Sequence, residues 1–438
     1  MKDNFLRASE AKERILSGAF DRRLEQYYGV SGDALAPYRE RLILAVDRFT
    51  ALFGDKPLRI FSASGRTELG GNHTDHQCGR VLAGGISLDM IAVASPNAVP
   101  EISICSEGFP AVTLSPAETN IRTEEYGTSA ALIRGTAARF AALGKPVGGF
   151  SAYMISDVPK GSGLSSSAAF EVLLGTICND FYADSAFSAA ELAIIAQYAE
   201  NKYFGKPCGL MDQMACALGA VCAIDFADPA APRWEQVPMN PSKEGYALCI
   251  IDSGADHAGL TDEYAAVPAE MKSVAAMFGK RTLRETDEAA FSARLPEIRK
   301  ACGDRAVLRA MHFYDENSRV AEQTAALRDG RFSDYLRMVN ASGRSSEAHL
   351  QNISPCGRPQ KQAVAVALAL CEKLLGGRGA YRVHGGGFAG TVQAYVPAED
   401  AESFRIGIDR VLGDGACQFV HIRTCGACSL WDEQEDTE

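Results

Sequence analysis

The sequence predicts an α+β protein with more than one domain. Segments typical of strands and of helices are mixed along the chain without the regular alternation of a doubly wound sheet. The length of 438 residues is enough for two or more complete cores. A hydrophobic content of 47% and a charged content of 23% are ordinary for a globular protein.

The N-terminal region is predicted to be helical. Residues 8–54 interleave charged side chains with regularly spaced apolar ones, and Val30-Ser31-Gly32 interrupts the pattern, so we expect two helices. A strand at residues 58–62 follows, and then a loop with glycines at 65, 70, 71 and 79. Residues 81–94, 99–105 and 149–155 have strand patterns, and residues 127–142 have a helical one.

The next helices are defined by their start signals. A Ser/Gly-rich loop precedes a helix predicted over residues 166–181. Ser188 and Glu191 form a capping box, which marks the start of another helix. Glu200 falls on the apolar stripe of that helix, where a carboxylate needs a partner. Its position alone leaves a buried ion pair and a metal ligand equally open.

The C-terminal half continues the mixture. We expect strands at residues 247–252, 381–396 and 417–423, and helices at residues 262–279, 287–301, 304–327, 331–342, 361–375 and 398–412. A cluster of Asp, Pro and Ala at residues 225–240 predicts a domain boundary. The predicted parts are therefore a helical extension (1–57), an N-terminal domain (58–235) and a C-terminal domain (236–438).

Charge and composition exclude several classes of protein. The net charge of −11 argues against nucleic-acid binding. The longest apolar run, residues 363–371, is far too short to span a membrane, and residues 1–5 lack the apolar core of a signal peptide, so we expect a cytoplasmic protein. The thirteen cysteines lie mostly in apolar contexts, which is typical of reduced thiols. Cys425 and Cys428 could bind zinc with His421, although their spacing fits no common zinc motif.

The segment Pro159–Ala169 predicts a phosphate site. Its glycines allow close backbone approach, its serines supply hydroxyls, and the following helix directs free N–H groups at the loop. An ordinary turn is the simpler interpretation of such a segment. The candidate phosphate-binding residues are Gly161, Ser162, Gly163, Leu164, Ser165, Ser166 and Ser167.

Two further glycine loops, Gly65–His76 and Gly385–Thr391, favour the phosphate site over an ordinary turn. The three loops in this order resemble the GHMP small-molecule kinases, and within them the galactokinase group. Residues 65–76 are similar to that group's signature Gly-Arg-x-Asn-Leu-Ile-Gly-Glu-His-Thr-Asp-Tyr, and residues 196–201, 208–213 and 309–320 resemble its other elements. The resemblance covers residues 58–430. It implies a two-domain GHMP kinase fold, with a ribosomal-protein-S5-like N-terminal domain and a ferredoxin-like C-terminal domain, here preceded by the helical extension.

The resemblance also implies the chemistry of the site. ATP is the implied cosubstrate, and Ser167 and Glu200 are the implied ligands of Mg²⁺. Asp212 matches the aspartate that takes the proton from the sugar's anomeric hydroxyl, and Arg66 would keep it ionised. The simpler alternative for Arg66 and Asp212 is a structural ion pair.

The implied sugar contacts come from the loops 65–76 and 385–391, from the element 208–213 and from the helix that begins near residue 262. They are Asn72, His73, Asp75, Gly209, Tyr264 and Gly386. Asn72 departs from the signature, which has a Glu that contacts the hydroxyl on C6, so we expect a weaker preference for a 6-hydroxyl. Alternatively, His76 takes over this contact.

Together these observations predict an ATP-dependent sugar-1-kinase, either a galactokinase or a close relative that acts on a C6-altered hexose. The alternatives are a catalytically silent sensor of sugar and ATP and another branch of GHMP kinases. We expect a monomer or weak homodimer that binds a small-molecule sugar but no nucleic acid and no membrane.

Overall fold

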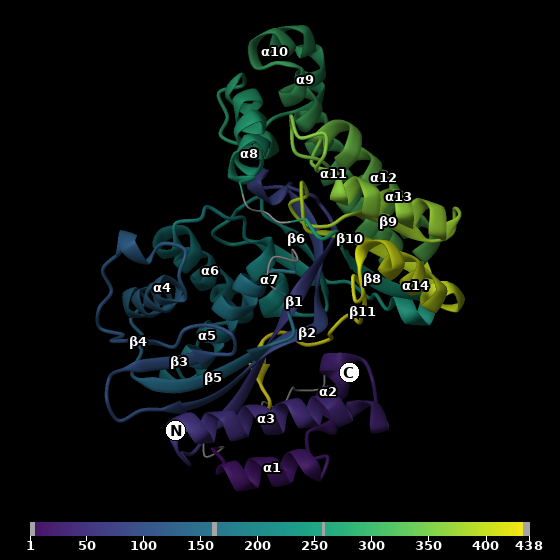
Figure 1. Cartoon of the computed structure of the whole chain (residues 1–438). Helices are drawn as coiled ribbons and strands as arrows, with labels where there is room; N and C mark the ends of the chain where they lie inside the picture. The colour runs from purple at the N-terminus through teal and green to yellow at the C-terminus, as the bar shows by residue number, and fades with distance from the viewer. Residues whose placement is uncertain (1–4, 160–163, 256–258, 432–438) are drawn as a thin grey trace.

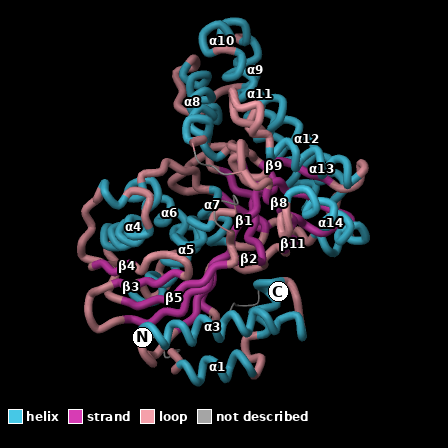
Figure 2. Tube along the Cα trace, viewed as in Figure 1, coloured by secondary structure: helices cyan, strands magenta, loops and turns pink. Residues whose placement is uncertain are grey.

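The computed structural model describes residues 5–159, 164–255 and 259–431 and folds as the predicted α+β protein (Figures 1 and 2). The helices are α1 (Ala8–Leu16), α2 (Asp21–Tyr28), α3 (Ala36–Phe53), α4 (Ser129–Ala142), α5 (Ser166–Tyr182), α6 (Ala189–Ala199), α7 (Met211–Leu218), α8 (Thr261–Ala276), α9 (Glu288–Ala293), α10 (Leu295–Cys302), α11 (Asp304–Arg328), α12 (Phe332–Ser345), α13 (Ala363–Leu375) and α14 (Ala401–Leu412). The strands are β1 (Arg59–Gly70), β2 (Arg80–Pro96), β3 (Ile102–Ser106), β4 (Val112–Leu114), β5 (Phe150–Ser156), β6 (Val221–Asp225), β7 (Arg233–Gln236), β8 (Tyr246–Asp252), β9 (Ala380–Val383), β10 (Thr391–Pro397), β11 (Cys417–Val420) and β12 (Cys428–Ser429).

The larger sheet has the order β12-β1-β2-β5-β3-β4, with β6 paired to the other end of β2 and β7 to β6. Its pairs are antiparallel except for β3 and β5. Both faces are buried, because alternate residues of one strand point to opposite faces. Phe61 packs into the core under α4–α7, whereas its neighbour Ile60 packs into the core under α1–α3. The helical extension therefore covers the second face of this sheet, as Figure 1 shows.

The smaller sheet has the order β11-β8-β10-β9 and is antiparallel throughout. One face packs with α13 and α14. The other forms an apolar core with α11, α12, the end of β1 and the start of β2. Helices α8–α11 form a separate apolar cluster and project beyond the sheets (Figure 1). The two sheets thus meet near the end of β1, beside the first glycine loop.

Within residues 8–54 the chain forms α1, α2 and α3, so the prediction of two helices was wrong in number. The predicted interruption at residues 30–32 is present, and Gly18 adds a second one. Gly18 has a φ of 78°, and the N–H of Ala19 donates to the carbonyl of Arg14 at 3.0 Å. This is the bonding pattern with which a left-handed glycine ends a helix.

The strand predicted at residues 58–62 is longer than expected. β1 continues to Gly70, so the first part of the predicted glycine loop, with Gly65 and Gly70, is strand. The pairing of β1 with β2 is irregular between Ser64 and Arg66 and between Glu68 and Gly70. Glycines inside a strand often mark such bulges, which redirect the side chains around them. The helix predicted over residues 287–301 was also wrong in extent, because Arg294 separates α9 from α10.

The end of the described chain returns to the first sheet. β12 pairs with β1, and the N–H of Leu430 donates to the carbonyl of Ile60 at 2.8 Å. The predicted domain boundary at residue 235 falls within β7, the last strand of the larger sheet before β8 begins the smaller one. The division into domains stays a prediction. No helix in the described part of the chain is both long and apolar enough to cross a bilayer.

Candidate active site

The centre of the candidate site is an ion pair between β1 and the start of α7. Arg66 Nε donates to Asp212 Oδ1 at 2.7 Å, and the Asp212 side chain keeps 35% of its surface exposed. Burial favours a raised pKa for Asp212, but the Arg66 charge and the hydrogen bonds from Arg66 and Ser165 outweigh it, so its pKa is lowered. Asp212 is therefore an ionised and accessible carboxylate.

The serine loop lies against this pair. Ser165 caps α5 with a left-handed φ of 60° and donates its hydroxyl to Asp212 Oδ2. Ser166 and Ser167 form the first turn of α5, whose N–H groups are available to an anion. The carbonyl of Leu164 accepts from the N–H of Arg66 at 3.3 Å. Gly161, Ser162 and Gly163 lie outside the described residues.

Glu200 lies where α6 passes into a π-helical turn, Glu200–Phe204, and is 2% exposed. Its Oε1 accepts from Lys206 Nζ at 3.2 Å, and its Oε2 accepts from Gln213 Nε2 at 2.8 Å. Gln213 also donates to Glu171 Oε2 at 3.1 Å. The ion pair, one of the two alternatives left open for Glu200, is thus present, between the buried Glu200 carboxylate and the largely exposed Lys206.

The first glycine loop meets the segment before α7. A Cβ atom on Gly209 would lie 1.7 Å from Asp75 Oδ2, so the Asp75 carboxylate packs directly on the Gly209 backbone. Because Gly209 lies three residues before Asp212, this contact brings Asp75 into the neighbourhood of the ion pair. The side chain of His73 also turns inward, and its φ is 61°.

The third glycine loop is held by side chains from other elements. His73 Nε2 donates to the carbonyl of Gly386 at 2.9 Å, and the Tyr264 hydroxyl donates to the carbonyl of Gly387 at 2.6 Å. A Cβ on Gly386 would lie 2.7 Å from the Tyr264 ring. Burial and the neighbouring His76 lower the pKa of His73 to about 3, so its ring is neutral. His73, Tyr264 and Gly386 thus meet at one point, as expected from their motifs.

Asn72 is placed differently from what its motif suggests. Its side chain is fully buried, and its amide bonds to protein groups on both sides. Nδ2 donates to Glu68 Oε1 at 3.0 Å and to the carbonyl of Gly385 at 2.6 Å. Oδ1 accepts from Ser346 at 3.2 Å and from Asn352 at 2.9 Å. Contact of this amide with a sugar stays a prediction, and the observed geometry does not favour it.

Sequence reasoning missed several polar residues behind the loops. Arg382 forms a buried ion pair with Glu68, and His384 Nε2 accepts from the N–H of Glu68 at 3.1 Å. His312 donates to the carbonyl of Asn72 at 3.0 Å, and Glu316 accepts from the N–H of Gly71 at 3.0 Å. The resemblance of residues 309–320 to the family does not by itself give His312 or Glu316 a role. Unusual polar residues within apolar strand and helix patterns were the available signal.

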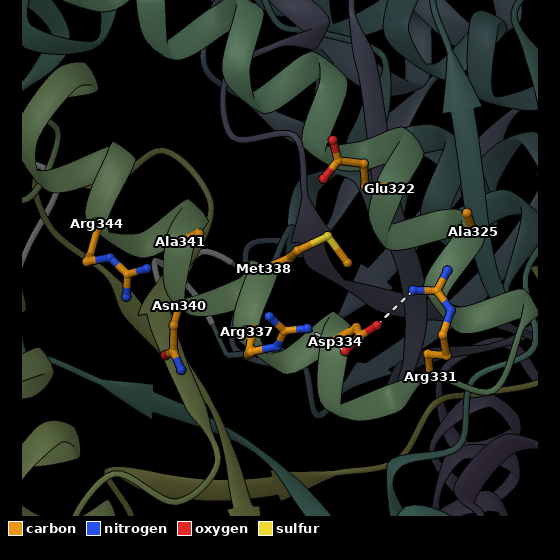
Figure 3. A pocket seen from close by; sticks show the side chains of 9 residues that line it. All are labelled: Glu322, Ala325, Arg331, Asp334, Arg337, Met338, Asn340, Ala341 and Arg344. Atoms are coloured by element: carbon orange, nitrogen blue, oxygen red, sulfur yellow. Dashed lines mark hydrogen bonds and ion pairs between the residues drawn. The ribbon is translucent and has the colours of Figure 1, made fainter.

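Neither a cluster of metal-ligating side chains nor a surface pocket adds residues to this site. In residues 5–159, 164–255 and 259–431, no group of three or more His, Cys, Asp or Glu is arranged to hold a metal ion. Cys428 instead lies 3.1 Å from the hydroxyl of Tyr27. A surface pocket of about 660 Å³ lies along α11 and α12, and none of the described candidate site residues lines it (Figure 3). Its lining residues are Glu322, Ala325, Arg331, Asp334, Arg337, Met338, Asn340, Ala341 and Arg344.

Comparison with known families agrees with this geometry. Residues 131–220 match the GHMP kinase N-terminal domain, which includes the serine loop, Glu200 and Asp212. Residues 47–96 match the galactokinase galactose-binding signature, which includes Arg66, His73 and Asp75. The fold and site therefore define a GHMP kinase, a phosphotransferase with a hydroxyl acceptor.

Similarity to individual proteins identifies the branch of GHMP kinases to which the chain belongs. The chain is 33% identical to the galactokinase of Homo sapiens over 370 residues, which cover 83% of this chain and 90% of the relative. It is 30% identical to the galactokinase of Streptomyces coelicolor over 362 residues, which cover 82% and 89%. The structure of Lactococcus lactis galactokinase complexed with galactose has the same fold, with a TM-score of 0.75, 23% identity, and coverage of 89% and 99%. The chain belongs to the galactokinase family.

Proposed function

We propose that this protein transfers the γ-phosphate of ATP to the anomeric hydroxyl of galactose and releases galactose 1-phosphate and ADP. The observation that carries the proposal is the accessible Asp212 carboxylate, which lies 2.7 Å from Arg66 and three residues after the Gly209 that packs on Asp75. A base for the attacking hydroxyl and a carboxylate for the other sugar hydroxyls are thus joined by one short segment. In phosphoryl transfer, such positioning accounts for much of the rate.

Asp212 would accept the proton of the attacking hydroxyl. Its lowered pKa means that it is deprotonated at neutral pH, and the Arg66 guanidinium holds one of its oxygens in place. The other oxygen accepts from the Ser165 hydroxyl. When the sugar binds, its anomeric hydroxyl would lie near this second oxygen.

Asp75 can accept from two adjacent sugar hydroxyls. His73, Gly209, Tyr264 and Gly386 complete the proposed sugar pocket. His73 is neutral, so it offers one donor and one acceptor nitrogen. The first turn of α5 and the serine hydroxyls would bind the phosphates of ATP through N–H groups and the helix dipole.

A divalent cation fits the surroundings of Glu200. Glu171 Oε1 and Gln213 Oε1 are buried, and neither has a hydrogen-bond partner among the described residues. Glu200 and the hydroxyl of Ser167 would hold Mg²⁺, since hard oxygen ligands suit this ion. When bound, Mg²⁺ supplies charge neutralisation on the phosphates.

A panel of sugars tests the proposal. Purified protein is given ATP and Mg²⁺ with galactose, 6-deoxygalactose, galacturonate or glucose, and ADP release is measured. We expect turnover with galactose above that with glucose. Binding of galactose and ATP without ADP release would instead favour the sensor, and turnover restricted to a C6-altered sugar would correct the substrate.

A further inference from the structure

The side chain of Asn72 is saturated by protein partners. Its two N–H bonds are directed to Glu68 and to the carbonyl of Gly385, and its oxygen accepts from Ser346 and Asn352. An amide offers two donor hydrogens and two acceptor lone pairs. All four are therefore used inside the protein, and a sugar hydroxyl could bond to this amide only by displacing one of these partners.

Glu68 joins Asn72 to the second sheet. Its carboxylate accepts from Asn72 and forms an ion pair with Arg382 of β9, and all three side chains are fully or almost fully buried. A buried charge without a partner is costly, so Glu68 and Arg382 depend on each other. Since Glu68 is on β1, the pair connects the two sheets behind the glycine loops.

The first loop also shows an exchange of residue types. In the signature that residues 65–76 resemble, Asn stands at the position of Glu68 and Glu at the position of Asn72. This chain has the same carboxylate and amide in the opposite order, and the two side chains are in contact at 3.0 Å. Positions 68 and 72 together thus still carry one carboxylate, which here is at position 68, next to Arg382.

The Gly385–Gly387 loop is the element that this pair positions. Each of its carbonyls accepts from a side chain: Gly385 from Asn72, Gly386 from His73 and Asn352, and Gly387 from Tyr264. Within this set, Asn72 is bonded to the buried pair of Glu68 and Arg382. A change at Glu68 would therefore reach the sugar pocket through Asn72.

We propose that Glu68, Asn72 and Arg382 form one positioning unit that sets the Gly385–Gly387 loop, and that Asn72 influences sugar binding without touching the sugar. The inference rests on the proposed function for the identity of the sugar. The linkage among the three side chains is independent of it and is tested without any ligand.

An isosteric double-mutant cycle tests the linkage. Glu68→Gln removes the carboxylate with which Arg382 forms its ion pair, so we expect a lower melting temperature in the wild-type background. Asn72→Asp places a second carboxylate beside Glu68, and two adjacent buried carboxylates disfavour ionisation of both. Adding Glu68→Gln to Asn72→Asp removes this repulsion, so we expect the melting temperature to rise. If Glu68→Gln shifted the melting temperature equally in the wild type and in Asn72→Asp, the proposed linkage would be wrong.

A binding experiment separates positioning from contact. Asn72→Ala is titrated by calorimetry with galactose and with 6-deoxygalactose, in the absence of nucleotide. If Asn72 only positions the Gly385–Gly387 loop, the affinities for both sugars should fall by a similar factor. We expect about 10-fold for the loss of its hydrogen bond to the loop. A loss confined to galactose would mean that Asn72 contacts the 6-hydroxyl, and the proposal would be wrong. If the wild type binds neither sugar, the proposed function fails while the melting-temperature cycle still decides the linkage.

Asn340 supplies a matched control. It accepts from the N–H of Tyr381 at 3.0 Å and donates to the carbonyl of Gly379 at 3.3 Å, so it braces the other end of β9. Figure 3 shows it on α12, along the surface pocket. Asn340→Ala is the same chemical change as Asn72→Ala, and we expect it to leave galactose affinity unchanged. A loss of affinity equal to that of Asn72→Ala would show that any brace of β9 matters, which contradicts a specific unit.

Discussion

Arg66 Nε lies 2.7 Å from Asp212 Oδ1, although 146 residues separate the two in the chain. Arg66 is on β1 at a bulge, and Asp212 is in the first turn of α7. The guanidinium reaches the start of α7, where the free N–H groups of the first helical turn also favour a carboxylate. The pair thus joins β1 to the first turn of α7.

The first prediction concerns this pair. Asp212→Asn keeps the size of the side chain but removes the base, so we expect kcat to fall by at least ~10²-fold with the fold retained. Steady-state kinetics and circular dichroism measure both. The control is Asp180→Asn, since Asp180 forms a similar buried pair with Arg59 outside the site. It should lower thermal stability but leave kcat near wild type, and near-wild-type turnover in Asp212→Asn would remove Asp212 from the mechanism.

The second prediction concerns the metal. Glu200→Gln keeps the shape of the side chain and removes its charge. If Glu200 holds Mg²⁺, the Mg²⁺ concentration for half-maximal activity rises, while galactose binding without nucleotide is unchanged. Lys206→Met is the control, because it breaks the ion pair of Glu200 but keeps the carboxylate. Equal losses of stability in both variants with an unaltered Mg²⁺ dependence would leave Glu200 a purely structural role.

The third prediction concerns Gly209. An alanine Cβ there would lie 1.7 Å from Asp75 Oδ2, so the carboxylate must move. A displacement of about 1 Å in a substrate-positioning group costs up to ~10²-fold in rate, so we expect a 10- to 100-fold rise in the galactose KM on this scale. Gly175→Ala in α5 is the control, since its nearest neighbour would be 3.6 Å away. If both variants have the wild-type KM, Asp75 does not bind the sugar from this position.

The fourth prediction concerns pH. The pKa of His73 falls from 6.5 to about 3 on folding, so the folded state resists protonation of this ring. The stability that His73 contributes is therefore complete above about pH 6.5 and is lost as the pH falls toward 3. Between pH 7.5 and 5.0 the stability of the wild type relative to His73→Gln should drop by up to about 2 kcal/mol. Urea unfolding of both proteins at the two pH values measures this, and a constant difference would disprove a buried neutral His73.

Short local patterns in the sequence correctly predicted where individual helices begin. The capping box of Ser188 and Glu191 is present at the start of α6, and the serine loop does precede α5. The family resemblance, not the local pattern, placed Arg66 beside Asp212. It assigned Asp75 and Gly209 to one sugar pocket, but their direct contact was not predicted.

Long-range pairs left no such signal. Glu68 and Arg382 lie 314 residues apart, and neither neighbourhood shows a pattern that demands the other. The same limit applies to the extension: amphipathic helices in residues 8–54 require a partner surface, but the sequence does not say that this surface is the outer face of β1, β2 and β5. The extent of β1 was underestimated because glycines usually end a strand pattern, whereas here they form bulges within it.

The most direct test of the account is the product itself. Wild-type protein is incubated with ATP, Mg²⁺ and galactose, and the reaction is followed by phosphorus NMR. We predict a new phosphomonoester signal, coupled to the anomeric proton of galactose, that grows as the γ-phosphate signal of ATP disappears and that is absent with Asp212→Asn. Saturable binding of galactose and ATP with no transfer to the anomeric oxygen would contradict the account and identify the protein as a sensor built on a kinase fold.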